Sequence, residues 1–348
     1  MTEAAKSHRT TKAPNVTLKS LALHLGLSVG TVSSVLNNSP ASRAIPERTR
    51  DRILKAARQL KYHPNLLARS LRMQRTYTVG VIAEEIGDAY GAMVISGIER
   101  FLRENNFFFL TVAHHHDHKL MNSYSQLLLA RGVEGIITID TSIDHRPTLP
   151  TVAIAGHQRI PTVTNIILDH HRAARIVLQH LLDLGHRQVA FFRGPSFSSD
   201  SASRWKAIQI VAAELNFPIH PELVFEIKGP PNTPDVGYLP AKALLATKLP
   251  FTAVVAYNDI SAVGTMTVFQ EAGLKVPDDV SVVGFDDIDV ASFAIPPLTT
   301  VHQPLLKMGT IAAQTLLDRI EDRAAFIPEI ALTPKLIIRK STGPARRP

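Results

Sequence analysis

The chain has 348 residues, contains no cysteine and carries a formal net charge of +8. The absence of cysteine excludes disulfides, thiolate metal ligands and a thiol nucleophile. No run approaches about 18 apolar residues and the N-terminus lacks the apolar core of a secretory signal, so we expect a soluble cytoplasmic protein without a membrane segment. The charge is uneven: residues 1–75 hold 14 Lys and Arg against 3 Asp and Glu, whereas residues 76–348 hold 24 against 27. A basic excess confined to the first 75 residues favours a polyanion-binding domain there.

Two short helices separated by a tight turn are predicted between residues 17 and 37. Thr17 is placed to cap the first helix, Gly26 to end it in the left-handed conformation, and Ser28 to cap the second. The apolar stripe of the second helix is Val32, Val35 and Leu36. The positions left on its other faces are Val29, Gly30, Thr31, Ser33 and Ser34. Two helices joined by so small a turn cross steeply, which is the helix-turn-helix arrangement; an ordinary helical hairpin is the alternative.

A polar arm precedes these helices, and a third helix and a linker follow them. Residues 1–15 are polar and basic without periodicity and are expected to be disordered. Pro46 is placed to open a helix whose buried stripe closes a three-helix core; the stripe is Ile53, Ala56, Ala57 and Leu60. After His63 and Pro64, residues 65–72 span only about two turns, which is marginal for an isolated helix. That segment is either a plain linker or a helix that forms on DNA and wedges leucine between base steps.

From Val79 onward, short apolar runs alternate with amphipathic stretches. The predicted strands are Val79–Ala83, Phe107–Val112, Gly135–Ile139, Thr151–Ala155, Val189–Phe192, Phe251–Ala256 and Val280–Phe285. The predicted helices are Ala92–Asn105, Lys119–Arg131, His171–Leu184, Ser203–Leu215, Pro240–Ala246 and Ser261–Ala272. This alternation predicts parallel sheets covered by helices on both faces. Because about 260 residues is large for one doubly wound sheet, we expect two lobes.

Eight stretches of sequence, taken in order, identify a family. They are VTLKSLALHLGLSVGTVSSVLN, TRDRILKAARQLKYHPNLLARSLR, GIER, RGVEGII, HLLDLGHRQVAF, AVVAYNDISAVGTM, VPDDVSVVGFDDI and PPLTTVHQP. Over residues 16–342 the chain resembles the lac-repressor-type (LacI/GalR) transcription factors. The resemblance implies an N-terminal all-α helix-turn-helix head, a hinge helix, and an α/β two-lobed core with parallel sheets, like the periplasmic sugar-binding proteins.

The resemblance also implies domain boundaries. The N-terminal arm is 1–15, the DNA-binding domain 16–62, the hinge helix or linker 63–76, the ligand-binding and dimerisation core 77–342, and the tail 343–348. Within the core, the first lobe takes about 77–170 and 304–328. The second lobe takes about 171–303 and 329–342.

The same resemblance assigns DNA-binding roles in the head and hinge. Val29, Gly30 and Ser34 would face base edges, but Ser34 stands where the family commonly has arginine, so a bidentate arginine–guanine contact is missing. We therefore expect an operator different from the family's usual one, or more reliance on phosphate contacts. The expected phosphate contacts are Thr17, Ser28, Thr31, Ser33, Asn37 and Tyr62. The expected hinge contacts are Asn65, Ala68, Arg69, Leu71 and Arg72; Leu71 would enter the minor groove, and an ordinary packing leucine is its alternative.

For a small-molecule effector, the resemblance implies five positions between the lobes. They are Tyr90, Arg204, Asn258, Asp286 and Gln303. A fork of donors, a carboxylate and two amides suits a polyhydroxylated ligand, and a sugar or related metabolite is the leading expectation. The alternatives are a strand-end cap for Asp286 and an interlobe salt bridge for Arg204. Ala89 and Gly91 replace the family's proline and second aromatic beside Tyr90, and GPPNTPD (229–235) lacks the aromatic on which many relatives stack a ligand, which points to an atypical effector.

Several other residues invite assignments that we do not favour. His114, His115, His116 and His118 with Asp117 follow a predicted strand and are interpreted as a solvated loop rather than a metal site. His170 and His171, at a helix start, are expected on the surface, and Trp205 is expected to pack. The adjacent carboxylates Asp286 and Asp287 point apart, so they do not form a general acid/base pair. No hydrolase, nucleotide or dinucleotide signature is present, so we expect no catalytic residue, no metal and no cofactor.

The sequence therefore predicts a ligand-responsive transcriptional regulator, most simply a repressor, that binds a pseudo-palindromic operator as a homodimer. Its partners are double-stranded operator DNA and an effector in the interlobe cleft, and its location is the nucleoid-associated cytoplasm. A solute-binding protein is a second hypothesis, which the basic head and the missing signal peptide oppose. An enzyme that uses the cleft is a third, which no sequence feature supports.

Overall fold

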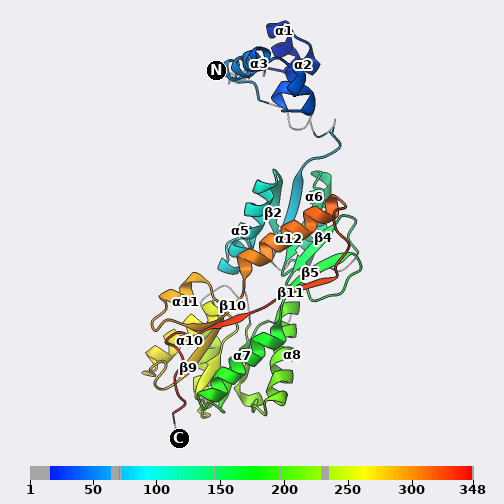
Figure 1. Cartoon of the computed structure of the whole chain (residues 1–348). Coiled ribbons are helices and arrows are strands. Elements are labelled where there is room, and N and C mark those ends of the chain that lie inside the picture. Colours follow the sequence, from blue (N-terminus) through cyan, green and yellow to red (C-terminus); the bar gives the residue numbers. More distant parts are fainter. Residues whose placement is uncertain are drawn as a thin grey trace, which may run out of the picture. The chain divides into compact units, whose positions relative to one another are not determined.

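The computed structural model describes residues 16–63, 70, 73–115, 117–143, 146–195, 198–228 and 235–346. The chain divides into two units, Met1–Thr76 and Tyr77–Pro348, which we call the head and the core and describe separately (Figure 1). The predicted arm and the hinge positions Asn65, Ala68, Arg69, Leu71 and Arg72 lie outside the described residues.

Over residues 16–63 the head forms three α-helices and one 3-10 turn. They are α1 (Leu18–Leu25), α2 (Val29–Leu36), η1 (Pro40–Ala44) and α3 (Glu47–Gln59). Thr17 and Ser20 form a capping box at the start of α1, Gly26 ends it at φ +65°, and Ser28 Oγ accepts from the Thr31 backbone N–H at 3.0 Å. The bend between α1 and α2 is 110°, as expected for a helix-turn-helix rather than a side-by-side hairpin.

The core of the head joins all three α-helices. Leu21 and Ala22 of α1, Val32 and Val35 of α2, and Ile53 of α3 are buried together, as the periodicity predicted. The predicted position of Ser33 was wrong: we expected it on an outer face of the helix, but it is only 7 % exposed. Ser33 Oγ accepts from Asn37 Nδ2 at 3.1 Å, so its polar atom bonds along α2.

The first lobe of the core is a six-stranded parallel sheet in the order β11-β5-β4-β3-β1-β2. Its strands are β1 (Thr78–Ala83), β2 (Phe108–Ala113), β3 (Gly135–Ile139), β4 (Thr151–Ile154), β5 (Val163–Leu168) and β11 (Glu329–Leu332). Its helices are α5 (Ala89–Glu104), α6 (His118–Ala130) and α12 (Leu305–Ile320). Helices α5 and α12 cover one face of the sheet, and α6 packs on the other (Figure 1).

The second lobe is a six-stranded sheet in the order β12-β10-β9-β8-β6-β7, parallel except for β12. Its strands are β6 (Val189–Arg193), β7 (Val224–Glu226), β8 (Ala253–Val255), β9 (Ser281–Asp286), β10 (Thr299–His302) and β12 (Lys335–Ile337). Its helices are α7 (His170–Asp183), α8 (Ser199–Glu214), η2 (Pro221–Leu223), α9 (Asp235–Thr247), α10 (Asp259–Glu271) and α11 (Asp289–Phe293). Helices α7 and α8 pack on one face, and α9 and α10 on the other.

The chain passes between the lobes three times, and the third passage differs from the expected boundary. Strand β11 pairs with β5, so residues 329–332 belong to the first lobe rather than the second. The passage to the second lobe lies between β11 and β12. The short strand Glu329–Leu332 has two exposed positions, which is why its sequence gave no strand signal.

Helices α5 and α12 approach each other through a pair of glycines. A Cβ at Gly97 would lie 2.0 Å from the Leu306 carbonyl oxygen, and a Cβ at Gly309 would lie 2.0 Å from the Val94 carbonyl oxygen. Any side chain at either position would therefore push the two backbones apart. Within the described residues, no single helix is long and apolar enough to cross a membrane.

Candidate functional site

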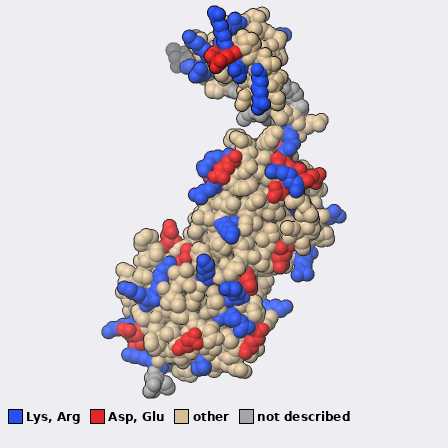
Figure 2. Space-filling view, viewed as in Figure 1, with Lys and Arg blue, Asp and Glu red and all other residues tan. Residues whose placement is uncertain are grey.

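Most of the predicted DNA-contacting residues in the described part of the head lie on α2 or cap it, whereas Thr17 caps α1 and Tyr62 follows α3. Thr17, Ser28, Val29 and Gly30 are exposed. Thr31, Ser34 and Asn37 are half-buried, Ser33 is buried, and Tyr62 packs against the core of the head. Figure 2 shows Lys and Arg side chains prevailing over the face of the head that is in view, whereas acidic and basic groups are mixed over the core. The exposed start of α2, on a head whose visible face carries mainly Lys and Arg, is suited to a polyanionic groove.

A cleft lies between the two lobes of the core, where strands β1 and β3 of the first lobe and β8 and β9 of the second reach their carboxyl ends. The space between its walls is about 550 Å³, including the part that opens to solvent. It is lined by Glu84, Glu85, Asp88, Tyr90, Gly91, Ile139, Asp140, Asp200, Arg204, Tyr257, Asn258 and Asp286. This edge of parallel sheets is where ligands bind in α/β proteins.

Four of the five predicted effector positions line this cleft: Tyr90, Arg204, Asn258 and Asp286. Gln303 does not line it; its Nε2 donates to Asp286 Oδ1 at 2.6 Å and so orients that carboxyl. Asn258 caps α10 by accepting from the Ser261 backbone N–H at 2.8 Å. The five residues are therefore brought together, four as lining and one as a support, and their binding of an effector stays a prediction.

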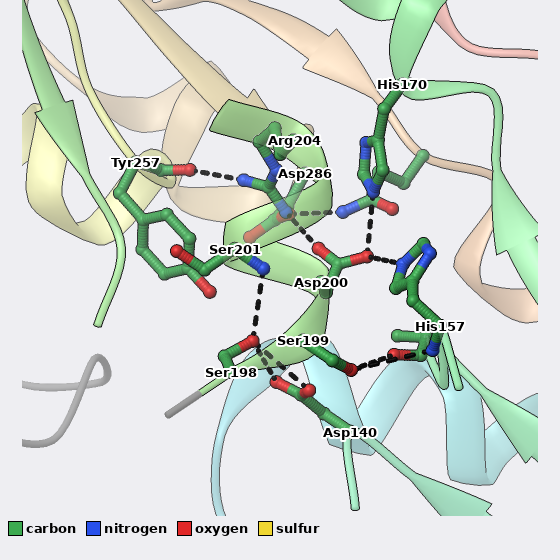
Figure 3. Close-up of polar contacts among 12 residues, drawn as sticks. Asp140, His157, His170, Ser198, Ser199, Asp200, Ser201, Arg204, Tyr257 and Asp286 are labelled. Carbon is green, nitrogen blue, oxygen red and sulfur yellow. Dashed lines mark hydrogen bonds and ion pairs between the residues drawn. The ribbon is translucent and has the colours of Figure 1, made fainter. Parts of the chain in front are cut away.

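Asp200 is the centre of the polar network in the cleft (Figure 3). Its Oδ1 accepts from His157 Nε2 at 2.9 Å and from His170 Nε2 at 2.8 Å, and its Oδ2 accepts from Arg204 Nη2 at 2.8 Å. His157 follows β4 of the first lobe, whereas Asp200 lies on α8 of the second. The Asp200 carboxylate therefore joins the lobes through its hydrogen bond with His157. Its ion pair with Arg204 lies within helix α8, so the alternative of an interlobe salt bridge for Arg204 was wrong.

The Arg204 guanidinium is enclosed by aromatic rings. It lies 3.7 Å from the centroid of the Phe285 ring and 4.9 Å from that of the Tyr257 ring. Arg204 Nη1 also donates to the Tyr257 carbonyl oxygen at 2.7 Å. Trp205 packs edge-on against Phe191, as expected for a core tryptophan. The cation is thus held in place by an ion pair, a backbone acceptor and two aromatic rings.

The carboxyl groups of the cleft titrate unusually. Burial and nearby acids, chiefly Asp140, raise the pKa of Glu84 to about 8. Burial and the charge of Asp200 raise the pKa of Asp140 to about 7, and burial with Asp259 nearby raises the pKa of Asp286 well above its ordinary value. Burial alone would raise the pKa of Asp200, but His170 and Arg204 hold it well below the ordinary range. Asp200 therefore stays ionised, and neighbouring groups of the protein compensate its negative charge.

The backbone turns sharply where the strands reach the cleft. Asp140 after β3 has φ +41°, Ala155 after β4 has φ +57°, and Asp286 at the end of β9 has φ +110°. Such conformations are strained for residues with a Cβ and concentrate at functional sites. Asp287 bonds away from Asp286, to His302 at 2.9 Å and Arg339 at 2.7 Å, so the two neighbouring carboxyls point apart as expected.

Several histidines differ from their predicted placement. His170 is 6 % exposed, because Asp200 from a distant segment covers it, whereas His171 is on the surface as expected. His114 is fully buried against Thr141 Oγ1 at 3.0 Å rather than solvated, while His115 is exposed and Asp117 caps α6. His116 and the side chain of His118 lie outside the described residues.

One cluster has donor atoms close enough to hold a metal ion. The ligand atoms of His157, His170 and Asp200 lie within 4.8 Å of one another. Both imidazoles donate to Asp200 through Nε2, and Arg204 occupies its second oxygen. The candidate ligand atoms are therefore already engaged in an ion-pair network, and a cation there would face a fixed guanidinium.

The sequence reasoning missed Glu84, Glu85, Asp88, Asp140, Asp200 and Tyr257 as lining residues. Glu84 and Asp140 each follow directly after a predicted strand, and a polar residue at the carboxyl end of a parallel strand is the signal that points to them. Nothing in the sequence around Asp200 pairs it with His157, which lies 43 residues away.

Comparison with known proteins gives consistent matches over both units. Residues 17–65 match the family described as bacterial regulatory proteins, lacI family, and residues 178–342 match a periplasmic binding protein-like domain. The HTH-type transcriptional repressor PurR of Haemophilus influenzae is 30 % identical over 336 residues, which cover 93 % of this chain and 98 % of that protein. PurR of Photobacterium profundum is 28 % identical over 337 residues, with the same coverages.

Solved structures agree with these relatives. A lac repressor dimer bound to operator and the anti-inducer ONPF superposes with a TM-score of 0.86 at 26 % identity, covering 94 % of this chain and 99 % of that one. A complex of the transcriptional regulator CelR with cellobiose superposes with a TM-score of 0.69 at 26 % identity, covering 94 % and 100 %.

Proposed function

Since the chain belongs to the lacI family of bacterial regulatory proteins, whose members bind DNA and small-molecule effectors as dimers, we propose that it represses transcription at a pseudo-palindromic operator under the control of an effector bound in the interlobe cleft. The observation that carries this proposal is that one chain combines a head suited to DNA with a core suited to a small ligand. A basic helix-turn-helix exposes the start of its second helix, and a two-lobed core encloses a polar cleft at the ends of its parallel strands. The family is one of DNA-binding regulators rather than enzymes.

The coupling follows from which groups the two lobes share. His157 of the first lobe donates to Asp200 of the second, and Ser198 Oγ of the second lobe donates to Asp140 of the first at 3.3 Å. An effector that contacts residues of both lobes changes the free energy of bringing them together. A different lobe orientation alters the spacing of the segments that lead to the two heads, and with it the operator affinity, which is a coupling free energy between two sites. A regulator of this kind acts on DNA in the nucleoid, within the cytoplasm.

A dimer fits the apolar side chains that the core exposes. Phe293, the last residue of α11, is 79 % exposed, and Ile295, two residues later, is 92 % exposed. Phe108 on the edge strand β2 is 68 % exposed. Large aromatic side chains this accessible are typical of interface anchors. The proposed homodimer would cover them with a second copy of the same chain.

We expect Phe293→Asp to convert the dimer to a monomer, because a carboxylate in a dry interface leaves an uncompensated charge. Operator affinity should then fall at least tenfold, since two half-sites are no longer bound together. Sedimentation at a few micromolar protein gives the mass, and Ile210→Asp, at a position 45 % exposed on α8, is the control that should stay dimeric. A Phe293→Asp protein that remains dimeric would remove this surface from the proposal.

The proposed function is tested by selecting randomised DNA duplexes with the full chain at about 150 mM salt, because low salt inflates non-specific binding. We expect one pseudo-palindrome to be enriched. Leu71→Ala should weaken binding to it by tenfold or more if the hinge leucine wedges between base steps, whereas Met73→Ala, at an exposed position two residues away, should bind like the native chain. Failure to enrich any sequence, both alone and with pooled metabolites, would contradict the regulator.

A further inference from the structure

A large space on the first lobe, separate from the interlobe cleft, is not used by the proposed function. It lies beside α6, on the face of the sheet opposite α5 and α12, and we call it the α6 hollow. The space between its walls is about 1210 Å³, including the part that opens to solvent, whereas the interlobe cleft has about 550 Å³. The described residues that line the two spaces are all different, so the α6 hollow is a separate place on the molecule.

The α6 hollow arises because two connections of the parallel sheet contain no helix in their described residues. Parallel neighbours are usually joined through a helix that covers the sheet. Here the connections 140–150, from β3 to β4, and 155–162, from β4 to β5, are loops where the structure describes them. Leu149 of the first connection packs with residues of α6 and β3, so this loop crosses the α6 face. The sheet beside α6 is therefore covered by loop rather than by a second helix, which leaves the hollow.

The walls of the α6 hollow are uncharged. Its described lining residues include no Lys, Arg, His, Asp or Glu. Apolar surface comes from Ile82 and Ile136 of the sheet and from Met121 of α6, and hydroxyl or amide groups come from Ser125 and Gln126. A concave lining that combines apolar surface with polar groups is typical of small-molecule sites. A charged ligand would find no compensating charge in this lining.

Thr138 on β3 brings an unsatisfied hydroxyl to the wall of the α6 hollow. Its side chain is 4 % exposed, and its Oγ1 is buried without a hydrogen-bond partner among the described residues. Asn165 Oδ1 on β5 is unpartnered in the same way, and it lines a smaller adjoining hollow that shares residues 141–143. Buried polar atoms are normally paired, so an unpaired one in a cavity wall points to a missing partner.

We propose that the α6 hollow is a second small-molecule site, for a neutral ligand that has an apolar ring or chain and a carbonyl or hydroxyl oxygen. The ligand oxygen accepts a hydrogen bond from the Thr138 hydroxyl, and the apolar part lies against Ile82 and Ile136. The competing explanation is that a water molecule alone satisfies Thr138. The experiments below measure ligand binding without DNA, so their failure leaves the proposed regulator untouched.

Three ring compounds of similar size test the class of ligand: cyclohexanone, cyclohexanecarboxylate and cyclohexylammonium. Saturation-transfer NMR titrations with the full chain measure their binding. We expect cyclohexanone to bind with a dissociation constant of about 1 mM, which is reasonable for seven non-hydrogen atoms. The two ions should bind at least tenfold more weakly, because the lining offers them no opposite charge. A preference for either ion, or no binding of cyclohexanone at ten times the expected constant, would overturn the proposal.

A pair of α6 variants locates the bound probe. Ser125→Phe fills the α6 hollow from the helix and should abolish the binding of cyclohexanone. Ser123→Phe, at an exposed position of the same helix, is the matched control and should bind like the native chain. Melting curves show that both variants fold. A folded Ser125→Phe protein with native binding would place the probe elsewhere and refute the site.

A pair of threonine variants tests the role of Thr138. Thr138→Val should weaken the binding of cyclohexanone about fivefold, the worth of one hydrogen bond, and should not lower the melting temperature of the unliganded chain. Thr151→Val is the matched control: Thr151 also lines the α6 hollow, but its Oγ1 donates to the Leu149 carbonyl oxygen at 3.0 Å, so its loss should lower the melting temperature. Equal lowering by both variants, with native binding by Thr138→Val, would show that water satisfies Thr138 and contradict the proposal.

Discussion

Replacing Arg204 by alanine is expected to lower the free energy of unfolding by about 3 kcal/mol. Removing one partner of a buried ion pair leaves the other charge uncompensated, which typically costs 3–5 kcal/mol. Both partners are nearly buried here, with side-chain exposures of 11 % for Arg204 and 10 % for Asp200. We expect the lower end of that range because His157 and His170 still donate to Asp200.

Two further variants test the cause of this loss. If the unpaired Asp200 carboxylate causes it, the double change Asp200→Asn with Arg204→Met should be less destabilised than Arg204→Met alone, and urea unfolding of the four proteins measures the coupling. Arg193→Ala is the control, because its ion pair with Glu226 is half-exposed and should contribute under about 1 kcal/mol. Equal losses for Arg204→Ala and Arg193→Ala would contradict the central role of Asp200–Arg204.

Stability is expected to fall as the pH rises from about 5.5 to 8. Asp140 has an ordinary pKa of 3.8 and a folded-state pKa of about 7, and Glu84 rises from 4.5 to about 8. Between the two values of each group, the folded chain holds a proton that the unfolded chain has released. Because only the folded state binds this proton there, the free energy of unfolding falls by up to about 1.4 kcal/mol per pH unit for each group as the pH rises, and it levels off above the folded-state pKa.

The melting temperature measured across this range provides the check. Asp140→Asn should reduce the slope, since the amide does not titrate, and Asp183→Asn on the surface of α7 should leave it unchanged. Asp200 acts in the opposite sense, because its lowered pKa makes its contribution complete above about pH 4 and lost only below it. A melting temperature that is flat from pH 5.5 to 8 in the native chain would contradict the raised pKa values of Asp140 and Glu84.

Much of the head was predictable because its structure is encoded locally. The caps at Thr17 and Ser28, the left-handed Gly26 and the stripe of α3 each depend on residues within one or two helical turns. The buried Ser33 was not predictable in the same way, since Val32, Ser33 and Val35 are all covered once α1 and α3 pack on α2. Burial on both sides of a helical stripe depends on tertiary packing.

In the core, long apolar strands were predictable, whereas short polar ones were not. Gly135–Ile139 has five buried positions in a row and was placed correctly at both ends. By contrast, β10 has the sequence TTVH and β7 has three half-buried residues, so their pairing partners rather than their own side chains define them.

Only the residues of the candidate site that lie in family sequence motifs were predictable. Arg204, Asn258 and Asp286 came from family resemblance, and the structure places them on one cleft. The acidic wall of Glu84 and Asp140 depends on β1 lying next to β3, and the burial of His170 depends on α8 reaching it. The strand-end positions of Glu84 and Asp140 can be recognised in the sequence, but which distant segments come into contact cannot be read from one sequence.

The glycine contact between α5 and α12 has a consequence for the order of events during synthesis. Gly97 emerges from the ribosome more than 200 residues before Gly309, yet each fits against the backbone of the other's helix. The first lobe also lacks its edge strand β11 until Leu332 has been made. The head can therefore fold on the ribosome from contiguous residues, while the first lobe must wait, partly open, for nearly the whole chain. Translational pauses or truncations after β10 should consequently leave an aggregation-prone nascent chain whose earliest-made lobe still lacks α12 and β11.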